Sequence, residues 1–312
     1  MRYLPIALIV ACGGAPAGPV NHSVEVIEIP DAQRVTPPDV TLLGAGQSPR
    51  VALRLHPEVG ESTAFTVRMS MRMALSFGGQ DAPPADSPDM VMVIGTRIRD
   101  IDASGTFRRD LVIEEVSVDP SHPLAAQIAP MLEPMRGMEG FEVFDAQGRP
   151  LAAHLNIPAN VPEQMRDTLE RSIEMMQGSS PPFPEEEVGV GARWRSVSRQ
   201  YNRFQFTRTT EYELLARDGD TITLRANSTL AAEPQPFELD DQHEAQITAY
   251  EGGGTANVNF ELNSARMSSE GTADVTLSLE LEPSPDNPNL TQMSISTRMG
   301  AVIESVERER QP

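Results

Sequence analysis

The chain has 312 residues, which is enough to bury the core of one large β-rich domain or of two smaller ones. Its 45 acidic and 25 basic residues give a formal net charge of −20, and such an acidic surface disfavours nucleic acid as a partner because it repels a phosphate backbone. Every basic residue is an arginine, and 15 methionines supply flexible apolar side chains suited to adaptable surfaces.

The N-terminus has the pattern of a short leader. Residues 1–11 hold one arginine and an apolar run, and a small residue precedes Cys12, the only cysteine. The tetrapeptide Ile9-Val10-Ala11-Cys12 resembles the lipobox of bacterial lipoproteins. That resemblance implies that residues 1–11 are a signal peptide that is removed and that Cys12 receives diacylglycerol and palmitate and becomes the new N-terminus. The alternative is an ordinary signal peptide with an incidental cysteine.

The lipobox resemblance also implies a location. Lipoproteins retained in the inner membrane commonly carry aspartate after the cysteine, whereas Gly13 stands here. We therefore expect a lipid-anchored protein of the cell envelope, attached to the outer membrane at either its periplasmic face or its surface face. The membrane would be its partner through the N-terminal lipid.

Residues 12–49 are rich in glycine, alanine and proline, a composition that predicts a flexible tether. A single β-rich domain is expected over 50–306, followed by a frayed tail at 307–312. A Pro-Glu-Val-Gly turn at 57–60 resembles the run at 184–189, and each precedes a long alternating strand. The parts 50–160 and 181–306 are therefore candidates for two related halves.

The first half predicts mostly hairpins. From Phe65 to Phe77 apolar side chains occupy the odd positions, the period of a half-buried strand. A hairpin is expected over 90–118, with a β-bulge near Glu114 where the alternation changes phase. Residues 119–135 predict a short helix broken by prolines. Another hairpin is expected over 141–155.

One amphipathic helix is predicted in the middle of the chain, from Val161 to Gln177. Asn160 can cap it, and apolar residues recur at helical spacing on one face. Beyond it, Trp194 is expected to anchor the core, and strands are expected at 204–214, 222–230, 245–250, 256–262, 275–281 and 290–303. The glycines 252–254 are expected to form a flexible connection between two of these strands.

This order of elements predicts an α+β fold that is mostly β. We expect a large curved antiparallel sheet, a half-barrel or incomplete barrel, with one main amphipathic helix and a short broken helix. The run Pro184–Trp194 is similar to a signature of uncharacterised, β-rich bacterial secreted proteins and lipoproteins. The architecture distantly resembles the LolA/LolB-type half-barrels, which carry lipids or lipoproteins. The resemblance covers architecture only and assigns no functional residue.

No catalytic motif is present. The five histidines show no metal-ligand spacing, and the densest group of potential ligands, residues 240–244, is typical of a solvated acidic loop. No nucleophile elbow or phosphate-binding loop occurs. We therefore expect no catalytic residue, no metal and no cofactor, and a non-enzymatic protein.

The candidate binding surface is apolar. It combines one face of the predicted strand with one face of the predicted helix, and its members are Met69, Met71, Met73, Phe77, Met165, Leu169 and Ile173. Methionines line adaptable binding surfaces but also fill cores. The leading hypothesis is binding of a lipid, another hydrophobic ligand or an envelope protein. The alternative is a structural or surface-display lipoprotein with a fully packed core and no ligand.

Overall fold

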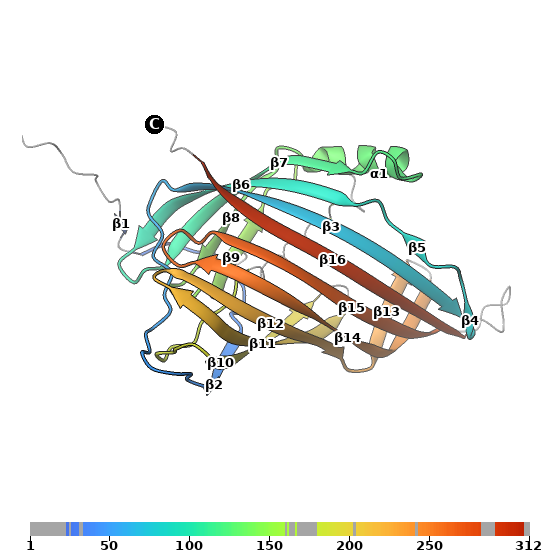
Figure 1. Ribbon diagram of the computed structural model, residues 1–312. Coiled ribbons are helices and arrows are strands. Elements are labelled where there is room, and N and C mark those ends of the chain that lie inside the picture. Colours follow the sequence, from blue (N-terminus) through green and yellow to red (C-terminus); the bar gives the residue numbers. More distant parts are fainter. Residues whose placement is uncertain are drawn as a thin grey trace, which may run out of the picture.

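The computed structural model describes residues 23–24, 26–30, 34–159, 161, 166, 180–201, 204–240, 243–281 and 291–308 (Figure 1). The leader, Cys12 and nearly all of the predicted helix 161–177 lie outside the described residues. None of the helices in the described part of the chain is both long and apolar enough to cross a membrane.

Most described residues belong to strands of one sheet. The strands are β1 (Ser23–Val24), β2 (Asp39–Gly44), β3 (Ser62–Phe77), β4 (Gln80–Asp81), β5 (Ala85–Asp86), β6 (Met90–Asp102), β7 (Phe107–Val118), β8 (Glu139–Phe144), β9 (Pro150–Leu155), β10 (Arg193–Tyr201), β11 (Gln205–Asp218), β12 (Thr221–Ala232), β13 (Gln235–Asp240), β14 (His243–Glu261), β15 (Met267–Leu281) and β16 (Gln292–Arg308).

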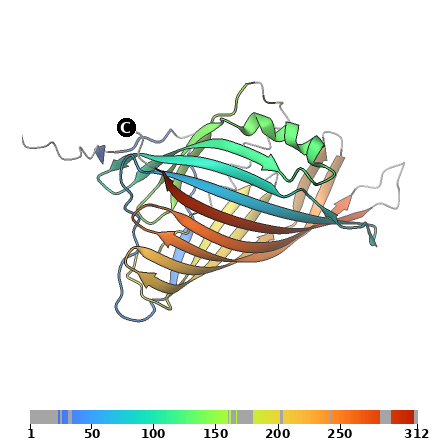
Figure 2. The same cartoon turned by 45° about the horizontal axis from the view of Figure 1, so that its top comes forward.

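The main order across the sheet is β2-β10-β11-β12-β14-β15-β16-β3-β6-β7-β8-β9. All these pairs are antiparallel, and among the described strands only the two-residue strand β1 pairs in parallel, with β6. The sheet is open and strongly curved (Figures 1 and 2). The predicted class, a mostly β fold with a large curved antiparallel sheet, is confirmed.

The local predictions of the first half are confirmed as well. In the β6–β7 hairpin Ile94 pairs with Ile113 and Val93 with Glu115, which leaves Glu114 as the bulged residue. The broken helix consists of α1 (Ala125–Leu132), which contains Pro130, and the 3₁₀ turn η2 (Glu133–Met135). Helix α1 lies along the rim of the sheet beside β7 (Figure 1).

The predicted tether 12–49 is wrong in its C-terminal part, because β2 pairs with β10. The segment before β2 also reaches the opposite edge, where the Val35 amide donates to the Leu151 carbonyl of β9 at 3.0 Å. The physical reason is local: Val40 and Leu42 alternate with exposed residues and pack on the core. The folded sheet therefore begins before residue 50.

The prediction that the glycines at 252–254 form a flexible connection is wrong. They lie inside β14, one continuous strand of 19 residues, and pair with β12 on one side and β15 on the other. A Cβ on Gly252 would come within 2.5 Å of the Asp274 carbonyl oxygen. Glycine stands here because neighbouring backbones approach closely, rather than to connect two strands flexibly.

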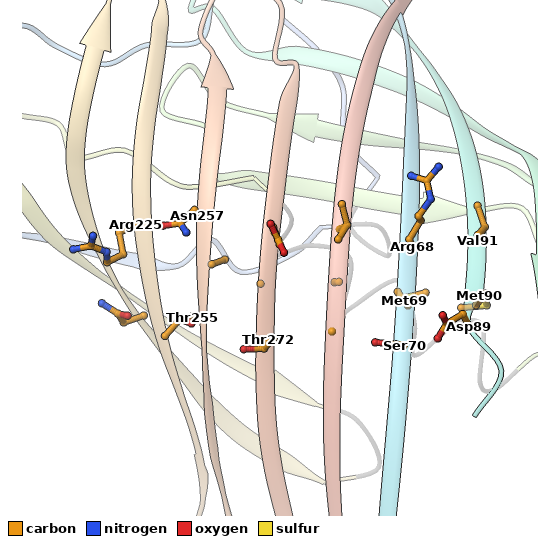
Figure 3. Close-up of a pocket in the computed structure, with 17 residues that line it drawn as sticks. Arg68, Met69, Ser70, Asp89, Met90, Val91, Arg225, Thr255, Asn257 and Thr272 are labelled. Carbon is orange, nitrogen blue, oxygen red and sulfur yellow. The ribbon is translucent and has the colours of Figure 1, made fainter. Parts of the chain in front are cut away.

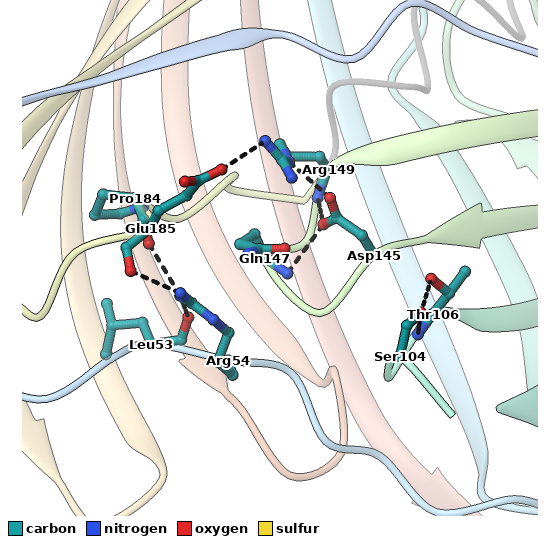
Figure 4. Close-up of polar contacts among 9 residues, drawn as sticks. All are labelled: Leu53, Arg54, Ser104, Thr106, Asp145, Gln147, Arg149, Pro184 and Glu185. Atoms are coloured by element: carbon teal, nitrogen blue, oxygen red, sulfur yellow. Dashed lines mark hydrogen bonds and ion pairs between the residues drawn. The ribbon is translucent and has the colours of Figure 1, made fainter. Parts of the chain in front are cut away.

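One end of the concave interior is filled by loops. Trp194 is fully buried, donates from Nε1 to the Pro182 carbonyl at 2.8 Å and lies edge-on to Phe183. Nearby, the Arg54 guanidinium donates to the Pro184 carbonyl at 3.0 Å and the Glu185 carbonyl at 2.7 Å (Figure 4). These contacts fix the loops against the sheet, and Trp194 is the core anchor that the sequence predicts.

Candidate functional site

The inward face of the sheet carries large packed side chains at both ends and small side chains in the middle. Along β12, Ile222 and Leu224 belong to the cluster around Trp194, while Leu230 packs on a second cluster at the far end that contains Phe204 and Ile247. The inward residues between them are only Ala226 and Ser228. Large apolar side chains are therefore missing from the centre of this strand.

The same gap continues across the neighbouring strands. Alternate residues of each strand face inward. The strand register places small inward-facing residues of β14, β15 and β16 in line with Ala226 and Ser228. They form what we call the floor: Ala226 and Ser228 of β12, Gly254 and Ala256 of β14, Gly271 and Ala273 of β15, and Ala301 of β16.

The floor is the base of an apolar groove of about 530 Å³, which we call the inner groove. This volume lies within the range of about 300–1,000 Å³ that small-molecule sites occupy. On one side, the groove is bounded by methionines and by helix α1; on the other, by residues of β11 and β12. The bounding side chains include Met69, Met71, Met90, Met299, Ile128 and Leu132 on the first side and Arg208 and Leu230 on the second.

Arg208 is the one charged residue that lines the inner groove within the described chain. It lies on the inward face of β11, since Phe206 and Thr210 on either side of it at alternate positions are both buried. Burial lowers the pKa of its guanidinium, while the phenols of Tyr212 and Tyr250 act in the opposite direction. An arginine nonetheless keeps its charge in a protein.

The predicted site residues divide into three groups. Met69 and Met71 line the inner groove. Met73 and Phe77 follow on the same face of β3, but they lie beyond the groove, and Phe77 is exposed at the strand end. Met165, Leu169 and Ile173 are outside the described residues. That any of these residues contacts a ligand stays a prediction.

The sequence reasoning missed the floor, Met90, Met299 and Arg208. A signal for the floor was available, because Gly271, Ala273 and Ala301 are small residues at inward positions of alternating strands. What could not be read is that these strands lie side by side with β12, β14 and β3. Small residues spread over the chain form one depression only after the sheet has assembled.

The outward face of the same strands carries a polar depression of about 840 Å³. Figure 3 shows Arg225 and Asn257 at one side and Arg68, Ser70 and Asp89 at the other. Its arginines are paired: Arg68 contacts Glu304 at 2.8 Å and Arg225 contacts Glu213 at 3.3 Å. Because these charges are already compensated and exposed, the inner groove is the better candidate site.

Metal binding finds no support among the described residues. They contain no group of three or more His, Cys, Asp or Glu side chains placed to hold an ion. Part of the predicted acidic loop at 240–244 lies outside the description. The absence of an enzymatic activity stays a prediction.

No protein-family model and no curated protein matches the chain. Among solved structures, Pseudomonas aeruginosa OccK2 (OpdF) in complex with glucuronate aligns at 6% identity and a TM-score of 0.18, over 80% of this chain and 99% of that chain. The InvG secretin domain β-barrel of the Salmonella SPI-1 injectisome aligns at 9% identity and a TM-score of 0.11, over 81% and 64%. With scores this low, neither likeness supports a conclusion about fold or function.

Proposed function

We propose that this chain is a non-enzymatic, lipid-anchored bacterial envelope protein that binds a hydrophobic ligand in the inner groove. The observation that supports the binding most strongly is the floor of small residues between two packed clusters. The anchor is supported by the lipobox-like sequence that ends at Cys12.

The groove favours a ligand because of what surrounds it. Protein interiors pack at the density of organic crystals, so a wide apolar gap inside a sheet leaves dispersion contacts unmade. At Gly254 and Gly271 the backbones approach too closely for a side chain, since a Cβ would lie 2.5 Å from the Thr272 carbonyl oxygen and 2.7 Å from that of Thr255. The other floor positions carry only Ala or Ser, where the ends of the same strands carry larger apolar residues. An apolar guest would restore the missing contacts. The methionines at the edge can adjust to its shape.

The test is to fill the groove from inside. Ala301→Phe places a ring on the floor, whereas Ala74→Phe adds the same ring on the outward face of the adjacent strand β3. Native mass spectrometry and lipid extraction of purified protein should find a bound apolar species in the wild type and in Ala74→Phe, and should find it lost or strongly reduced in Ala301→Phe. Wild-type protein that carries nothing and does not bind a neutral fluorescent apolar probe would favour the structural lipoprotein with a packed core.

The lipid anchor has its own test. Radiolabelled palmitate should enter the wild-type protein in bacteria, and Cys12→Ser should abolish the labelling because the thiol is the acceptor. Labelling that persists in Cys12→Ser would remove the anchor from the proposal. The groove experiment would be unaffected.

A further inference from the structure

We propose that Arg208 binds the anionic headgroup of an amphiphile whose hydrocarbon chain lies in the inner groove. This inference rests on the proposed function and narrows the ligand class from any hydrophobic molecule to acidic, single-chain lipids. It is carried by the position, the surroundings and the missing partner of one side chain.

Arg208 lacks the carboxylate partner that Arg109, another arginine on the inward face, has. Arg109 Nη2 donates to Glu142 Oε2 at 2.7 Å, and both side chains are almost buried. The sheet thus supplies a carboxylate where it encloses this cation. The Arg208 side chain is half-buried, and its guanidinium makes no hydrogen bond or ion pair with the residues that the structure describes.

An enclosed cation without a counter-charge is costly, and the cost falls when a bound anion pairs with it. No aspartate or glutamate lines the inner groove in the part of the chain that the structure describes. A ligand can therefore supply the negative charge that pairs with Arg208. A guanidinium presents several N–H donors in one plane and matches a carboxylate or a phosphate with two parallel hydrogen bonds.

The polar and apolar parts of the groove lie at opposite sides. Arg208 is on β11, and the Ser228 hydroxyl, which contacts Thr210 Oγ1 at 2.9 Å, lies on the adjacent strand β12. The methionines of β3 and β6 and the residues Ile128 and Leu132 of α1 are at the other side. Five strand spacings separate β11 from β3, about 24 Å along the curved sheet. This layout fits a head and an extended chain.

The experiment uses the purified full chain after removal of co-purifying lipid. A neutral fluorescent probe, N-phenyl-1-naphthylamine, reports on the groove, and three competitors with the same sixteen-carbon chain displace it: palmitic acid, palmitoyl lysophosphatidate and 1-hexadecanol. At least one of the two acids should displace the probe at concentrations about ten- to a hundred-fold lower than the alcohol, since a charged hydrogen-bonded pair contributes that much to affinity. Whichever acid is stronger identifies the headgroup as a carboxylate or a phosphate.

Arg208→Met should remove this preference, leaving the affinity for 1-hexadecanol within about two-fold of the wild type, because methionine keeps the apolar length but not the charge. Arg225→Met, on the outward face of the neighbouring strand β12, should change neither. Equal displacement by acids and alcohol in the wild type would overturn the inference while leaving the proposed function standing. This wild-type comparison does not depend on whether any variant folds. A probe that fails to bind at all would instead overturn the proposed function.

Discussion

At the scale of single residues, the interior at the loop-filled end is built around stacked aromatic rings. Tyr212 stacks on Trp194 with ring centroids 5.5 Å apart, and both are buried. Burial raises the pKa of the Tyr212 phenol to about 12, although the nearby Arg208 charge acts to lower it. The folded protein therefore holds this proton more tightly than the unfolded chain, in which a phenol has a pKa of about 10.

This difference predicts an alkaline limit on stability. The stabilisation is complete below about pH 10, and it is lost as pH rises from about 10 to 12, because only the unfolded chain releases the proton in that range. The loss should reach at most about 3 kcal/mol. Urea unfolding at several pH values should show it in the wild type and show a flatter profile in Tyr212→Phe. The exposed Tyr201 provides the control: Tyr201→Phe should behave as the wild type does.

Arg109 and Glu142 form an ion pair across β7 and β8, and their side chains are 12% and 8% exposed. Glu142→Gln should destabilise the fold by about 3–5 kcal/mol, because it leaves a buried cation without its carboxylate. Asp274→Asn removes the carboxylate from an equally short pair with Arg298, but those side chains are 64% and 70% exposed, so its cost should stay below about 1 kcal/mol. Equal midpoints of urea unfolding for the two variants would contradict this reasoning.

At the scale of elements, β14 shows why close-packed strands restrict side chains. We predict that Gly252→Ala destabilises the protein by about 1–3 kcal/mol, since its Cβ would lie 2.5 Å from the Asp274 carbonyl oxygen and a shift of backbone would follow. Gly44→Ala, in the edge strand β2, meets no atom within 4 Å and should be neutral. Thermal unfolding followed by circular dichroism compares them, and a neutral Gly252→Ala would show that the strands can move apart.

These elements also show what the sequence can reveal. Strand β3 follows from period-two alternation, and the bulge at Glu114 follows from a break in that alternation, because both signals are local. The sequence alone predicts two strands in place of β14, because glycine favours turns in isolation. Its glycines are explained only by the backbones of β12 and β15, which approach from distant parts of the chain.

The candidate site has the same division between local and non-local information. Met69 and Met71 can be identified from β3 alone, since they belong to its apolar face. The floor and Arg208 come from strands between residues 205 and 308, and no spacing in the sequence aligns them. The sequence places Arg208 among inward-facing residues, but only the folded sheet shows that no carboxylate of the described residues pairs with it.

At the scale of the whole molecule, one pairing joins the two parts of the sheet. Strands β3 to β9 come from the first half of the chain and β10 to β16 from the second, and each set is contiguous in the sheet. The junction is β16 against β3, with 16 residues of each strand paired from Met293–Phe77 to Arg308–Ser62. The last strand of the sequence therefore lies in the interior of the sheet, where it forms part of the floor through Ala301.

This arrangement predicts that the C-terminal strand is needed for cooperative folding. A chain that lacks residues 291–312 would expose the long edges of β15 and β3 together, and the two halves would be connected mainly through the loops and the edge segment at 34–44. In the intact protein, tryptophan fluorescence, which reports on Trp194 in the second half, and far-ultraviolet circular dichroism should give the same urea midpoint. In the truncated chain the two midpoints should separate, or the protein should aggregate.

A chain that lacks residues 1–33 keeps all twelve strands of the main sheet order and should retain coincident midpoints. Coincident midpoints in soluble protein without β16 would mean that the halves fold as one unit by other contacts.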